Sequence, residues 1–136
     1  MDERLNAPYW ALRIAFGAVP VVAGLDKFVG LLADWEAYLS PLVAAVVPAS
    51  VFMKLVGVIE IAAGLLVLSG MVRIGAAVVG LWLVGIALNL LTTGKYFDVA
   101  VRDLVMATGA FALMRIEEVR ERESVAARAS LAQRRA

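Results

Sequence analysis

The sequence predicts an all-α, polytopic membrane protein in which four transmembrane helices form an antiparallel bundle. Of its 136 residues, 62% are hydrophobic, well above the roughly 45–50% apolar share of soluble domains. These residues are gathered in stretches of about 20, the length at which an α-helix crosses roughly 30 Å of hydrocarbon. The stretches lack the polar–apolar alternation of a transmembrane barrel strand, and an open sheet edge does not survive in lipid, so all of them are expected to be helices.

The expected transmembrane domain covers residues 1–116. Its four spans are predicted at about residues 9–32, 50–69, 74–92 and 98–115. Residues 33–49 are too apolar for a solvated loop and too short to cross a membrane, which predicts a turn or short helix at the outer interface, with Trp35 and Tyr38 at headgroup depth.

A charged tail, residues 117–136, follows the last span. Glu118 and Arg122 are four residues apart, and Glu117 and Arg120 are three apart. Such spacings stabilise a helix through ion pairs, so the tail is expected to extend the last helix into water.

The basic residues predict the orientation. Outside the spans, they lie in the N-terminal segment, in the connection at residues 70–73 and in the tail, whereas residues 33–49 contain none and the last connection contains only Lys95. Cytoplasmic segments collect Lys and Arg. Both termini are therefore expected in the cytoplasm, with the protein in the inner (plasma) membrane of a bacterium.

Composition excludes several classes of function. A net charge of +1 does not suit nucleic-acid binding, which needs a strongly basic face. The chain has no Cys and no His, so disulfides, His-ligated haem, Cys-ligated iron–sulfur clusters and most zinc or copper sites are not expected. No metal site is predicted, and no nucleophile–base pair identifies a catalytic residue.

Two pairs of glycines predict close contacts between helices. Gly17 and Gly24 are seven residues apart, as are Gly57 and Gly64, which places each pair on one helix face. Small residues let helix backbones approach closely in lipid.

Charged and amide side chains inside the apolar segments are the candidate functional residues. At mid-membrane a charge costs about 2.5–3.5 kcal/mol on insertion scales, so such residues usually face the bundle interior and pair. The predicted buried polar network consists of Arg13, Asp26, Lys27, Glu60, Asn89, Arg102 and Asp103.

A rise of about 1.5 Å per residue predicts how these residues are layered. Asp26, Lys27, Asn89, Arg102 and Asp103 are expected in one outer layer. Glu60 is expected near the middle of its span, with Arg13 reaching toward it from the cytoplasmic side. Because neighbours on a helix diverge by about 100°, Asp26 and Lys27 should find partners on other helices, as should Arg102 and Asp103.

Two readings of the network stay open. In the first, the ion pairs set helix register and rotation, and the protein has no chemistry of its own. In the second, the outer layer lines a small cavity that holds a quinone headgroup, a proton path or a small polar substrate.

Over residues 12–113 the sequence resembles the DoxX family of small four-span membrane proteins. The matching segments are LRIAFG at residues 12–17, AGLDKF at 23–28, GVIEIAAGLLVL at 57–68, RIGA at 73–76 and RDLVMATGA at 102–110. The family includes a membrane subunit of an archaeal thiosulfate:quinone oxidoreductase and members linked to oxidative-stress complexes. The resemblance implies a non-catalytic, accessory subunit that works with an oxidoreductase partner and a quinone. The alternatives are a structural or interaction protein, and a small transporter active as a homo-oligomer.

Overall fold

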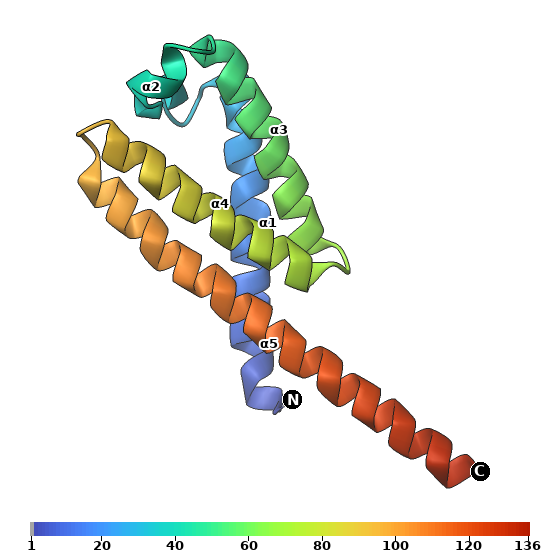
Figure 1. Ribbon diagram of the computed structural model, residues 1–136. Helices are drawn as coiled ribbons and strands as arrows, with labels where there is room; N and C mark the ends of the chain where they lie inside the picture. Colours follow the sequence, from blue (N-terminus) through green and yellow to red (C-terminus); the bar gives the residue numbers. More distant parts are fainter. Residues whose placement is uncertain (1) are drawn as a thin grey trace.

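The computed structural model describes residues 2–136, which are 85% helical and contain no strand. Five α-helices follow one another in this part of the chain (Figure 1). They are α1 (Asn6–Val29), α2 (Pro41–Ala44), α3 (Ala49–Leu68), α4 (Val72–Thr92) and α5 (Phe97–Arg135). Short 3-10 turns, Glu3–Leu5 and Trp35–Tyr38, precede α1 and α2. The predicted all-α class is confirmed.

Local chemistry explains where the helices begin and end. Gly30 adopts a left-handed conformation (φ 73°) that ends α1, a role glycine fills because it has no Cβ. Pro41 begins α2, with the Ser40 hydroxyl accepting from the Leu42 N–H. The charged tail continues α5 without interruption as far as Arg135.

Helices α1 and α3 form one tightly packed antiparallel pair. A Cβ built on Gly24 would lie 2.5 Å from the Gly57 carbonyl oxygen, and one built on Gly57 would lie 2.7 Å from the Gly24 carbonyl oxygen. Gly17 and Gly64 face each other in the same way. The glycine contacts predicted from the sequence are confirmed, and they bring the two backbones together.

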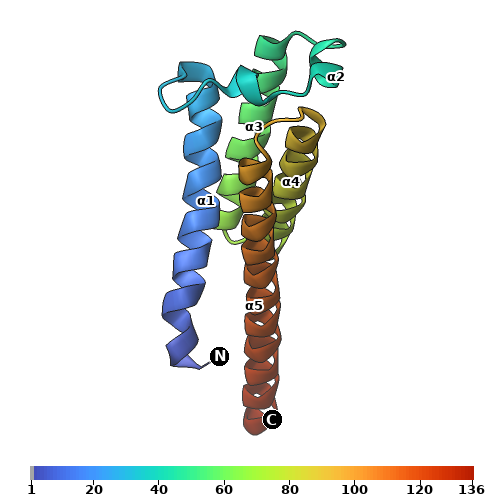
Figure 2. The same ribbon diagram turned by 90° about the vertical axis from the view of Figure 1, so that its left-hand side faces the viewer.

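Helices α4 and α5 form the second pair. The two pairs meet near the turn between α3 and α4, at the end from which the C-terminal part of α5 projects (Figure 1); we call this the tail end of the bundle. The core there combines residues from all four long helices: Tyr9, Ala63, Val67, Val72, Ala76, Val79, Ala110 and Leu113. Toward the opposite, loop end the pairs diverge (Figure 1), and the connection between α1 and α3 crosses the ends of the helices there (Figure 2).

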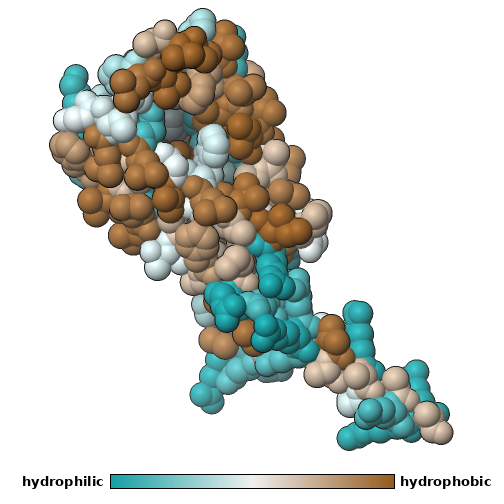
Figure 3. All heavy atoms as spheres, in the orientation of Figure 1, coloured by the Kyte–Doolittle hydropathy of each residue, from teal (hydrophilic) through white to brown (hydrophobic). Residues whose placement is uncertain are grey.

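The exterior of the bundle is apolar. Large hydrophobic side chains are exposed on every long helix, among them Ile14, Leu55, Leu81 and Val105. The face of the bundle seen in Figure 3 is mostly hydrophobic, with some hydrophilic side chains near the loop end, and the tail below it is mostly hydrophilic. Among the described helices, α3 and α4 are long and apolar enough to cross a membrane, by length and composition alone.

Candidate functional site

A buried ion pair between α1 and α3 lies at the centre of the predicted polar network. The Lys27 Nζ lies 2.6 Å from the Glu60 Oε2, and the two side chains are only 4% and 8% exposed. The second oxygen of Glu60 accepts a 3.4 Å hydrogen bond from the Trp82 indole N–H on α4. Lys27 also lies 3.8 Å from the centroid of the Trp35 ring. The expectation that Lys27 pairs with another helix rather than with Asp26 is confirmed.

Asp26 has a different role from the predicted one. Its carboxylate accepts hydrogen bonds from the Leu31 and Leu32 N–H groups, at 2.8 and 3.0 Å, and from the Trp35 indole N–H at 2.7 Å. The partners of Asp26 therefore lie outside α1, as expected, but they belong to the connection and its 3-10 turn and not to another of the long helices. The left-handed turn at Gly30 folds the chain back over the last turn of α1, so the nearest donors belong to the connection itself.

Arg13 lies apart from the network. The sequence predicted a reach toward Glu60, but the guanidinium donates to the carbonyl oxygens of Val67, Leu68 and Ser69 at 3.1, 3.2 and 2.5 Å. That prediction is wrong for two reasons. The carbonyls at the end of α3 lack helical partners and lie at the negative end of the helix dipole, which attracts a cation. In addition, Lys27 already neutralises Glu60.

Asn89 fastens the connection to α4. Its side-chain oxygen accepts from the Ser40 N–H at 3.0 Å, and its amide nitrogen donates to the Tyr38 carbonyl at 2.8 Å. The Tyr38 ring lies 4.6 Å, centroid to centroid, from that of Tyr96, just before α5. These contacts hold the connection across the loop end, where Tyr38 covers the space between the helix pairs.

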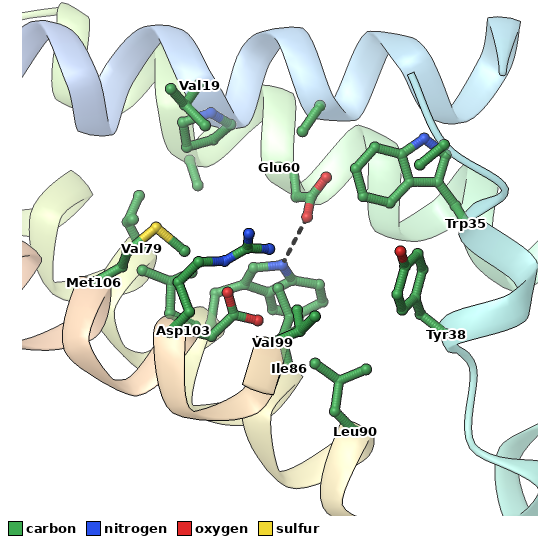
Figure 4. A pocket seen from close by; sticks show the side chains of 17 residues that line it. Val19, Trp35, Tyr38, Glu60, Val79, Ile86, Leu90, Val99, Asp103 and Met106 are labelled. Atoms are coloured by element: carbon green, nitrogen blue, oxygen red, sulfur yellow. Dashed lines mark hydrogen bonds between the residues drawn. The ribbon is translucent and has the colours of Figure 1, made fainter. Parts of the chain in front are cut away.

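That space is a cavity of about 340 Å³, which we call the polar cavity. Its polar and aromatic lining residues are Trp35, Tyr38, Glu60, Trp82, Arg102 and Asp103, and apolar side chains from α1, α3, α4 and α5 complete the walls. Figure 4 shows the carboxylates of Glu60 and Asp103 on opposite sides of it, with Trp35 and Tyr38 at one end. In Figure 3 the surface is hollowed near the loop end.

Arg102 and Asp103 have no hydrogen-bond or ion-pair partner within residues 2–136. Asp103 is only 6% exposed, so this is a buried carboxylate whose hydrogen-bonding capacity is unused. Its oxygens are not among the fully enclosed polar atoms that lack a partner in the described residues, so they are open to the cavity that Asp103 lines. The expectation that these two residues pair with other helices is therefore wrong; both line the polar cavity instead.

Side chains of α1 and α5 that line the cavity lie close to the exterior of the bundle. Phe16 packs against Gly109, where an added Cβ would lie 2.9 Å from the ring, and this contact joins the two helices toward the tail end. Val19 on α1 and Met106 on α5 line the cavity about one turn farther along. Val19 is also exposed on the apolar exterior, so the lining of the cavity reaches that surface.

The tryptophans are the site residues that sequence reasoning missed. Trp82 was not among the predicted site residues, and Trp35 was expected only at headgroup depth, yet each indole N–H donates to a network carboxylate. A chemical signal was available in the sequence. An indole N–H inside an apolar segment needs an acceptor when it is buried, and Asp26, Glu60 and Asp103 are acidic side chains in the neighbouring spans.

The cavity suits a neutral, polar ligand. Lys27 balances Glu60, and Arg102 balances Asp103, so the ionisable groups at the site sum to zero and an ionic ligand would add uncompensated charge. Arg102 offers donors, while Asp103 and Glu60 offer acceptors. Within residues 2–136 no cluster of three or more His, Cys, Asp or Glu side chains is placed to hold a metal ion.

Comparison with known proteins found no matching family, no similar curated protein and no similar solved structure. The DoxX resemblance therefore stays a prediction from the sequence.

Proposed function

We propose that the chain is an integral membrane protein with four spans, formed by α1, α3, α4 and the part of α5 before Arg115. The apolar exterior supports this proposal, because soluble monomers rarely expose continuous apolar patches larger than a few hundred Å². Arg4, Arg73 and Arg115 lie at the tail end, which supports cytoplasmic termini in a bacterial inner membrane.

Within that membrane, the polar cavity binds the headgroup of a quinone. The observation that carries this proposal is the pair of unpartnered groups, Arg102 and Asp103, in a charge-balanced cavity whose lining reaches the apolar exterior at Val19. A quinone is neutral and dissolves in the bilayer, so it would reach the cavity from that exterior. Its carbonyl oxygens would accept from Arg102, and the hydroxyls of its reduced form would donate to Asp103 or Glu60.

The chain serves as an accessory subunit of a quinone-linked redox system, and an oxidoreductase partner supplies the electron transfer. The DoxX resemblance supports this role at the level of a family analogy. The aromatic walls formed by Trp35, Tyr38 and Trp82 support it independently, because ligand sites combine apolar and aromatic walls with a few convergent polar groups.

The test is to purify the protein in mild detergent, extract its bound lipids and measure quinone per mole of protein. Arg102→Met should lower quinone occupancy by about 10- to 100-fold, the value of one charge-assisted hydrogen bond. Lys54→Met is the matched control, because Lys54 is an exposed cation on α3 that lines neither the polar cavity nor the second cavity described below.

Absence of quinone from the unaltered protein, together with unchanged membrane quinone reduction after deletion of the gene, would contradict the proposal. That result would favour the alternative in which the ion pairs only set helix register and rotation. Co-purification from native membranes tests the partner: an oxidoreductase should be recovered with the chain and lost under conditions that dissociate complexes.

A further inference from the structure

A second cavity lies on the other side of the Glu60–Trp82 contact. It measures about 300 Å³ and is lined mainly by apolar side chains of α3, α4 and the connection, among them Val43, Phe52, Met53 and Gly85. We call it the apolar cavity. Helices α3 and α4 are joined by a short turn at the tail end and diverge toward the loop end, so this cavity is the space between them, covered by α2.

The two cavities share one wall. Trp35, Glu60, Trp82 and Ile86 line both of them, so a single layer of side chains separates the two spaces. The hydrogen bond within this wall, from Trp82 to Glu60, measures 3.4 Å, longer than the usual 2.9–3.0 Å of an N–H···O bond. A rotation of the Trp82 side chain therefore breaks a weak bond and leaves the strong Lys27–Glu60 pair intact.

We propose that the two cavities form one bipartite site, in which the apolar cavity holds the hydrocarbon chain of the molecule whose headgroup occupies the polar cavity. This inference rests on the proposed function of the polar cavity. The occupant follows from the contrast between the two linings. The unpartnered Arg102 and Asp103 line only the polar cavity, whereas the polar groups of the apolar cavity, Lys27 and Asn89, already have protein partners.

Gly85 provides a specific way to fill the apolar cavity. A Cβ added to Gly85 would have no atom within 4 Å, and Gly85 does not line the polar cavity. Gly85→Leu should therefore occupy the space for the chain without touching Arg102 or Asp103. Val43→Phe fills the same cavity from α2, so either variant that folds serves the test.

Two probes separate headgroup from chain: a dimethoxy-methyl-benzoquinone without a side chain, and the same ring with a ten-carbon alkyl chain. Binding to the detergent-solubilised full chain is measured by quenching of tryptophan fluorescence, since Trp35 and Trp82 line the site. Gly85→Leu should weaken binding of the alkylated probe by about tenfold or more, the value of two or so buried methylenes. Binding of the short probe should not change.

Lys54→Met, at an exposed residue that lines neither cavity, is the control and should bind both probes as the unaltered protein does. Equal binding of the alkylated probe to the unaltered protein and both filled variants would overturn the bipartite site and leave the headgroup proposal standing. If the short probe does not bind the unaltered protein at all, the headgroup proposal fails, and the inference fails with it.

Discussion

At the scale of single residues, the charged side chains of the predicted network divide into two groups according to whether they have protein partners, and one of them, Arg102, is exposed rather than buried as the sequence predicted. Lys27, Glu60 and Asp26 are satisfied by protein groups, and they hold α1, α3 and the connection together. Arg102 and Asp103 have no such partners and face a cavity. The first group explains how the loop end keeps its shape, and the second explains what that shape leaves available to a ligand.

Replacing Glu60 tests the buried pair. Glu60→Leu should lower the free energy of unfolding by about 3–5 kcal/mol, because it leaves the Lys27 ammonium buried without a counter-charge. Glu60→Gln should cost less, about 1–3 kcal/mol, because its amide oxygen still accepts a hydrogen bond. Unfolding in detergent micelles measures both. Glu36→Gln, at an exposed carboxylate, should change stability by less than about 0.5 kcal/mol. Equal stability of the two Glu60 variants would contradict the pairing.

A double-mutant cycle separates Arg13 from the network. Arg13→Met removes hydrogen bonds to the end of α3 only, so its effect and that of Glu60→Gln should add within about 0.5 kcal/mol. Lys27→Met combined with Glu60→Gln should deviate from additivity by more than that, since the two side chains are in contact. A deviation from additivity of more than about 0.5 kcal/mol between Arg13→Met and Glu60→Gln would instead support the Arg13–Glu60 pairing expected from the sequence.

At the scale of elements, the positions of the helices could be predicted from the sequence, but the ion pairs could not. An apolar stretch of a given length sets where a helix runs, and α3 and α4 match their expected ranges within two residues. Glycine spacing also identified the α1–α3 contact. The partners of Asp26 depend on how Gly30 turns the chain, and those of Arg13 on where α3 ends. Neither follows from depth along a helix.

The glycine contacts between α1 and α3 give the prediction at this scale. Gly24→Ala places a Cβ against the Gly57 carbonyl oxygen, so the two helices must separate, and stability should fall by about 1–3 kcal/mol. Gly85→Ala is the control, because its Cβ meets open space and alanine stabilises a helix by roughly 0.5–1 kcal/mol relative to glycine. The free energy of unfolding, measured in detergent, should therefore fall for Gly24→Ala and rise for Gly85→Ala. A Gly24→Ala variant as stable as Gly85→Ala would contradict the close packing.

The tail forms a second, separate part of α5. Glu118 is buried among Arg73, Arg115 and Arg122, so the ion pairs expected within the tail also connect it to the start of α4. Every residue from 124 onward is exposed. The bundle therefore determines the direction of the tail through Glu118, while the last turns of α5 add nothing to the core.

At the scale of the whole molecule, two helix pairs joined at one end and spread at the other produce the site. The joined end carries the main core and the Arg73–Glu118 ion pair. The spread end cannot close on itself, since Trp35, Tyr38 and Asn89 hold the connection across it. The cavity is therefore a consequence of the packing, and under the proposed function its ligand reaches it from lipid around the bundle.

Cysteine labelling tests directly whether lipid surrounds the bundle, because the chain contains no cysteine of its own. With a membrane-impermeant maleimide and intact cells stripped of any outer envelope, Ala37→Cys in the exposed connection should be labelled. Ser130→Cys in the tail should react only after lysis, since the two ends are proposed to lie on opposite sides of the membrane. Leu88→Cys, exposed on the apolar face of α4, should stay unlabelled in both conditions, because a thiol in lipid does not ionise to the reactive thiolate. Labelling of all three positions in intact cells would mean that the apolar exterior is covered by something other than a bilayer.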